Sequence, residues 1–140
     1  MGEALLDVNV LLALAWPNHQ HHAAAHAWFR QASRRGWATC ALTQLAFVRL
    51  SSNPAYTPAP VTPAEATALL ARLTAHGKHR YWDTLAAPVG DTFRRAAGHQ
   101  QVMDAYLVRE AERHRGRLST FDRRVAAHAT TAAAVEILEG

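Results

Sequence analysis

The chain has 140 residues, and its 15 Lys and Arg outnumber 11 Asp and Glu to give a formal net charge of +4. Its 49% hydrophobic content excludes a mainly disordered chain, and its one cysteine excludes a disulfide scaffold and is typical of a reducing compartment. No apolar run reaches the roughly 18 residues of a membrane span, and acidic residues precede the first apolar stretch, so we expect one soluble, cytoplasmic domain over residues 1–140 with no membrane partner.

Apolar periodicity and turn residues predict alternating strands and helices. In chain order these are strand 3–7, helix 8–16, helix 20–35, strand 37–41, helix 43–52 capped by Thr43, loop 54–61, helix 62–76, a short strand within 77–82, helix 91–97, helix 99–115, strand 117–120, helix 123–129 and strand 135–138. Thr62 and Glu65 have the spacing of a capping box. The alternation predicts an α/β fold with a mainly parallel sheet covered by helices on both faces.

Three aspartates form a candidate site, because the predicted arrangement can bring them together. Asp7 ends the first strand, Asp122 comes just after strand 117–120, and Asp104 lies in the first turns of helix 99–115. Sites in parallel sheets form at the carboxyl ends of strands. Clustered carboxylates repel one another unless a cation binds, and oxygen ligands select Mg²⁺ or Mn²⁺, which activate water against a phosphodiester. Singly, the three residues have plainer interpretations as a helix cap, a solvent-facing acid and a turn residue.

Four segments carry a family resemblance through their order and spacing. They are LLDVNVLLAL (5–14), TQLAFVRLSSNP (43–54), HQQVMDAYLVREA (99–111) and LSTFDRRV (118–125). Together they resemble the PIN-domain ribonucleases, specifically the VapC toxins of bacterial type II toxin–antitoxin modules. The resemblance implies a PIN-like three-layer α/β/α domain, commonly a homodimer. It also implies an endoribonuclease that arrests growth by cleaving structured RNA, of the tRNA or rRNA class, under control of a VapB-like antitoxin.

The resemblance also assigns residues. Asp7, Asp104 and Asp122 fall on three acidic positions of the family and would hold Mg²⁺, with Mn²⁺ as the alternative. The family commonly has a glutamate where this chain has Gln44, whose carbonyl oxygen remains a candidate ligand. Whether another acid such as Asp83 replaces the missing charge is open.

Arginines supply the expected contacts to RNA. Fourteen of the 15 cations are arginines, a bias that suits phosphate binding and equally suits a GC-rich genome. Arg123 and Arg124 directly follow Asp122, and Arg49 lies five residues after Gln44. We expect these three to bind backbone phosphates, with a solvated helix face as the alternative for Arg49.

Other functions fit parts of the sequence less well than a nuclease does. The loss of a charge at Gln44 is compatible with a catalytically weakened module that only binds RNA or antitoxin. A phosphatase of the haloacid-dehalogenase class needs a second Asp two residues after Asp7, where this chain has Asn9, and a downstream lysine, of which Lys78 is the only one. His22 and His26, in a cluster with His19 and His21, have the spacing of a zinc pair, but no HExxH context surrounds them and no cysteine or third ligand is implied, which favours a solvated helix start.

Overall fold

The sheet is the centre of the molecule. A computed structural model describes residues 2–140, and its five strands lie in the order β3-β2-β1-β4-β5. Every neighbouring pair is parallel, which confirms the predicted type of sheet. The strands are β1 (Ala4–Leu6), β2 (Trp37–Cys40), β3 (His79–Trp82), β4 (Arg117–Thr120) and β5 (Val135–Ile137).

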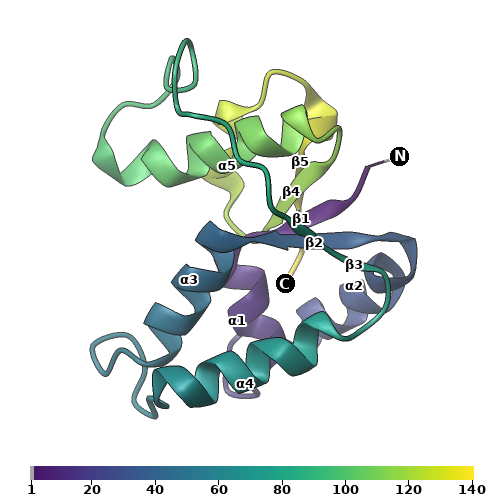
Figure 1. Cartoon of the computed structure of the whole chain (residues 1–140), viewed down its shortest axis with the longest axis vertical. Helices are drawn as coiled ribbons and strands as arrows, with labels where there is room; N and C mark the ends of the chain where they lie inside the picture. The colour runs from purple at the N-terminus through teal and green to yellow at the C-terminus, as the bar shows by residue number, and fades with distance from the viewer. Residues whose placement is uncertain (1) are drawn as a thin grey trace.

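Helices cover both faces of this sheet and complete a three-layer α/β/α fold, as expected. One layer holds α1 (Val8–Ala15), α2 (His22–Arg35), α3 (Ala41–Ser51) and α4 (Pro63–Thr74). The other holds α5 (Val102–Arg113) and the 3-10 helix η2 (Arg123–His128). Figure 1 shows the sheet nearly edge-on, with α1 to α4 on one side and α5 on the other. Two further 3-10 helices are η1 (His99–Gln101) and η3 (Ala132–Ala134).

The central strand β1 shows why the fold forms. Its residues alternate between faces: Ala4 and Leu6 pack into the core under α1 and α2, and Leu5 packs into the core under α5. All three are fully buried. A strand covered on both faces is apolar at every position, which explains why no polar residue interrupts it.

Two predicted helix details are wrong. Helix α3 begins at Ala41 with Cys40 as its N-cap, so Thr43 sits inside the first turn, where its hydroxyl accepts a hydrogen bond from the Cys40 amide (3.1 Å). Residues 91–95 form turns, and 96–97 have no regular structure, where a helix was expected. That segment has little apolar surface to bury, and its Asp91 carboxylate is held by Arg109 on α5 at 2.7 Å.

The other predicted elements are present and differ mainly in where they begin and end. The expected helix 123–129 is the 3-10 helix η2, which ends at His128. His22 and His26 bond the carbonyl oxygens of Ala13 and Leu14, at 2.7 and 2.8 Å, and so satisfy the free end of α1. Within residues 2–140, no helix has the length and apolar character required to cross a membrane.

Candidate active site

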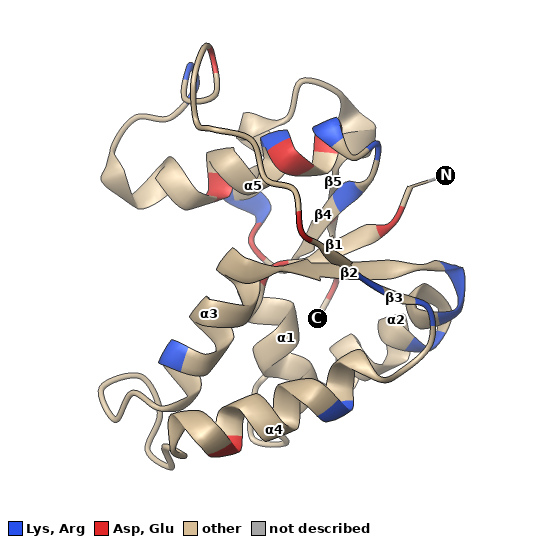
Figure 2. Cartoon of the chain, in the orientation of Figure 1, with Lys and Arg blue, Asp and Glu red and all other residues tan. Residues whose placement is uncertain are grey.

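Neighbouring strands bring two of the three aspartates to one edge of the sheet. β1 pairs with β4, and both end where the chain continues into Asp7 and toward Asp122. The Asp7 amide bonds the Ser119 carbonyl at 3.0 Å, which fixes the chain after β1 against β4. Asp104 comes from the first turn of α5, which packs against β4 and η2. Figure 2 shows acidic positions gathered where α5, the end of β4 and the start of α1 meet.

Thr120, the last residue of β4, is the hydrogen-bonding centre of this site. Its buried hydroxyl donates to Asp7 Oδ2 (2.8 Å) and accepts from the Asn9 amide (3.0 Å) and the Asp122 backbone N–H (3.1 Å). Asn9 in turn accepts from the Phe121 backbone N–H (3.2 Å). The roles of Thr120 and Asn9 were not predicted from the sequence. The available signal was their position two residues from an aspartate in the first and last of the four segments.

Burial and mutual repulsion weaken the acidity of two of the carboxyl groups. The pKa of Asp7 is raised from 3.8 to about 6, chiefly by burial and in smaller part by the charges of Asp104 and Asp122, against the hydrogen bonds from Thr120 and Val8, which lower it. The pKa of Asp104 is raised by burial and then by Asp122. The structure therefore brings the three predicted aspartates within electrostatic reach of one another.

Asp122 is the exception because it already has a cationic partner. The Arg124 guanidinium donates to both of its oxygens, at 3.0 and 2.9 Å, and the Asp122 carboxylate caps η2 by accepting a hydrogen bond from the Arg124 backbone N–H (3.0 Å). These contacts lower the pKa of Asp122. Arg123, its predicted companion in phosphate binding, instead pairs with Glu139 at 2.9 Å on the surface.

The chemistry of the site fits a hard divalent cation. Its donors are carboxylate and hydroxyl oxygens, and a cation would relieve the repulsion that raises the pKa of Asp7 and Asp104. Among residues 2–140, no three His, Cys, Asp or Glu side chains stand together as a complete ligand set. Mg²⁺ does not need one, because it keeps several waters and binds through one or two carboxylates.

The other predicted residues lie farther from the aspartates. The hydrogen bond that the structure gives Gln44 joins its amide to the Thr39 hydroxyl (2.9 Å), at the end of β2. Arg49 is exposed in the last turn of α3, about 12 Å along the helix from its start at the sheet edge. Asp83 is exposed after edge strand β3, which β2 separates from β1. The structure does not bring Arg49 or Asp83 to the aspartates.

Comparison with known proteins agrees with this geometry. The PIN domain family profile matches residues 4–131. Ribonuclease VapC39 of Mycobacterium tuberculosis is 48% identical over 138 residues, which cover 96% of this chain and 99% of that protein. The chain belongs to the VapC branch of the PIN-domain family. Ribonuclease VapC38 of the same species is 45% identical, with 85% of this chain and 84% of that protein covered.

The family membership also accounts for the fold. The crystal structure of PAE2754 from Pyrobaculum aerophilum matches with a TM-score of 0.58 at 23% identity, covering 97% of this chain and 84% of that one. This likeness concerns the PIN fold alone. The VapC relatives at 36–48% identity are named ribonucleases, so the alternative of a binding module with a weakened site is not favoured.

Proposed function

We propose that this VapC-family protein is the endoribonuclease toxin of a type II toxin–antitoxin module, and that it cleaves RNA with Mg²⁺, or alternatively Mn²⁺, held by Asp7, Asp104 and Asp122. The observation that carries the proposal is the placement of Asp7, Asp104 and Asp122 within electrostatic reach of one another, with the buried Asp7 carboxylate fixed by Thr120 and its pKa raised to about 6, chiefly by burial. A bound divalent cation would supply a polarised phosphoryl oxygen and a water of lowered pKa.

The side chains around the cation site have separate roles in this proposal. Asp7 and Asp104 are the primary ligands, because burial makes their charges costly without a cation. Thr120 positions Asp7 through its hydroxyl. Arg124 holds Asp122 and is placed to exchange that carboxylate for an RNA phosphate, since arginine binds either group through the same fork. Arg123 and, more distantly, Arg49 would bind phosphates along the strand.

The proposed partners follow from the family. The substrate is RNA of the tRNA or rRNA class, the inhibitor is a VapB-like antitoxin, and the complex would act in the cytoplasm. We also propose a homodimer. An apolar hollow between α3 and α5, lined by Leu42, Phe93 and Met103 among others, supports it. Val102 and Met103 are 43% and 49% exposed there, which is more typical of an interface than of a free surface.

The test is cleavage of total bacterial RNA by the purified, antitoxin-free protein in Mg²⁺, Mn²⁺ or EDTA. Discrete fragments are expected with a metal and not with EDTA. Asp7→Asn and Asp104→Asn should each remove them, whereas Asp83→Asn, which changes an exposed acid away from the site, should not. Metal-independent cleavage would contradict the proposed chemistry. RNA binding without cleavage by the wild type would instead support the binding module.

A further inference from the structure

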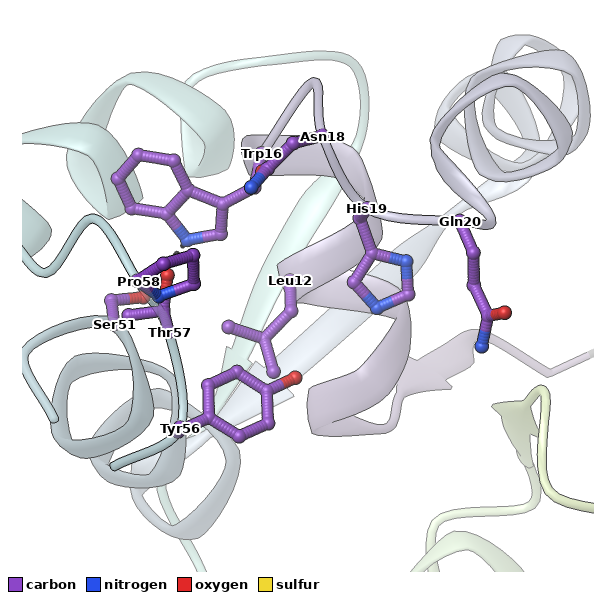
Figure 3. Close-up of a pocket in the computed structure, with 9 residues that line it drawn as sticks. All are labelled: Leu12, Trp16, Asn18, His19, Gln20, Ser51, Tyr56, Thr57 and Pro58. Carbon is purple, nitrogen blue, oxygen red and sulfur yellow. Dashed lines mark hydrogen bonds between the residues drawn. The ribbon is translucent and has the colours of Figure 1, made fainter. Parts of the chain in front are cut away.

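Besides the hollow between α3 and α5, a second one lies in the helical layer that contains α1, away from the aspartates. It has a volume of about 280 Å³ and is formed by the end of α1, the end of α3 and the loop that follows α3. Figure 3 shows Leu12 between Trp16 and Tyr56, with the Tyr56 hydroxyl pointing toward the side where His19 lies. This volume is just below the usual range of ligand pockets, roughly 300–1,000 Å³, so it suits one ring system better than an extended ligand.

The walls of this pocket are aromatic, and its rim is polar. The indole of Trp16 is fixed by a hydrogen bond from Nε1 to the Ser51 hydroxyl (3.1 Å). Tyr56 is 48% exposed, so its ring is free to contact a ligand. His19 Nδ1 accepts the His21 backbone N–H (3.0 Å), which leaves its other ring nitrogen as a donor. Asn18 adds an amide with both donors and an acceptor.

A row of rings connects this pocket to the aspartates. The rings of His19 and His21 are 5.8 Å apart, and His21 stacks on Phe121 at 4.3 Å with nearly parallel planes. Phe121 directly precedes Asp122, and its backbone is tied to Asn9 beside Asp7. The three rings thus lie between the pocket and the carboxylates, with Gly140 against the His21 ring and Phe121 packed against the core.

We propose that the pocket holds one unpaired base of the RNA substrate, while the strand leads from His19 at the rim of the pocket toward the aspartates. Bases of single-stranded RNA stack on aromatic rings and present polar edges to side chains, and the pocket offers both kinds of contact. The inference rests on the proposed nuclease function. It adds that the substrate is single-stranded near the cut and that Tyr56 selects for a base at a fixed distance from it.

Binding of labelled octaribonucleotides tests the pocket without cleavage. Fluorescein-labelled A8, C8 and U8, and an octamer of abasic ribose phosphates, are titrated in EDTA and followed by anisotropy. The wild type should bind at least one base-carrying octamer roughly tenfold more tightly than the abasic one. Tyr56→Ala should abolish that preference, Tyr56→Phe should retain most of it, and Asn18→Ala should change the ranking of the three bases. Tyr81→Ala, which removes a similarly exposed tyrosine on β3 (45%), should behave as wild type.

The outcomes separate this inference from the proposed reaction. Equal affinity of the wild type for base-carrying and abasic octamers, or an unchanged preference in Tyr56→Ala, overturns the pocket assignment, even if Mg²⁺-dependent cleavage of total RNA is normal. Absence of metal-dependent cleavage, with the Tyr56-dependent base preference intact, overturns the reaction and supports the pocket. A melting temperature of Tyr56→Ala equal to that of the wild type confirms that the variant is folded.

Discussion

At the scale of single residues, the site depends on one hydroxyl as much as on its acids. Thr120 uses its one hydrogen and both lone pairs within the site, on Asp7, Asn9 and the Asp122 amide. A buried group with all its hydrogen bonds satisfied fixes the positions of its partners, because any other arrangement would cost a buried hydrogen bond. Thr120 is therefore a positioning residue, and its loss should lower both the free energy of unfolding and the rate of RNA cleavage.

Thr120→Val keeps the shape of the side chain and removes the hydroxyl. The free energy of unfolding should fall by roughly 2–4 kcal/mol, because a buried carboxylate and a buried amide lose their partner. Urea denaturation measures this change, and RNA cleavage should fall with it. Thr120→Ser is the matched control and should restore cleavage, since it loses only a methyl group. Equal cleavage by the valine and serine variants would contradict the positioning role.

The raised pKa of Asp7 predicts a pH dependence of stability. The folded protein holds the Asp7 proton up to about pH 6, whereas the unfolded chain releases it near 3.8. Between these values the folded state binds more protons, so the free energy of unfolding falls as pH rises from about 4 to 6, by about 2–3 kcal/mol from this group. Urea denaturation in EDTA should show a steeper fall for the wild type than for Asp7→Asn. Parallel curves would contradict it.

The sequence predicted that Asp7 and Asp122 would lie close together because strand ends in a parallel sheet share an edge, and a strand end is visible in the pattern of apolar residues. Asp104 was predicted differently, from the apolar helical segment around it and from the family resemblance. The sequence did not predict Thr120 and Asn9, whose hydrogen bond joins positions 111 residues apart and involves residue types that are common everywhere. Nor did it predict that Arg124 turns back onto Asp122. The sequence order placed both residues together but does not determine the rotamer of an exposed arginine.

At the scale of elements, helix-capping rules predicted the start of α4 correctly, because no neighbouring element determines where that helix begins. The capping box at α4 is present in full: the Thr62 hydroxyl accepts from the Glu65 amide (3.1 Å), and the Glu65 carboxylate accepts from the Thr62 amide (2.8 Å). The same rule failed for α3, where Thr43 looked like a cap. There the chain leaves β2 directly into a helix, and Cys40 takes the capping position.

Thr62→Ala tests the contribution of this cap to α4. The free energy of unfolding should fall by about 1 kcal/mol, because the Glu65 amide in the first turn loses its partner. Thr67→Ala is the matched control, since Thr67 is exposed on the same helix and its hydroxyl only bonds back to the Pro63 carbonyl. Urea denaturation compares them, and RNA cleavage should be unchanged in both. A loss in Thr67→Ala as large as in Thr62→Ala would contradict the assignment.

At the scale of the whole molecule, the helices on the two faces of the sheet form two hollows of different character. The layer of α1 to α4 carries the aromatic pocket, and the face between α3 and α5 carries the apolar hollow. The alternation of strands and helices predicted the layers. It did not predict either hollow, because each is formed by side chains from segments that are distant in sequence.

Met103→Glu tests whether the hollow between α3 and α5 is a dimer interface. A charge there would lose its hydration on association, so the dimer should dissociate at least tenfold more readily. Sedimentation equilibrium measures the dissociation constant. Val89→Glu is the control, because Val89 is 71% exposed and lies outside the hollow. A monomeric wild type, or an unchanged constant in Met103→Glu, would contradict the proposed homodimer at this face.

The hydrogen bond between Thr120 and Asp7 has a consequence for how the protein is made. It joins residues 113 positions apart, and β4 must pair with β1 before it forms. A ribosome synthesises the chain from its N-terminus at about 5–20 residues per second, so Asp7 emerges well before Thr120. During that interval the nascent chain has no assembled site. A chain that stops before β4 is therefore expected to have no nuclease activity.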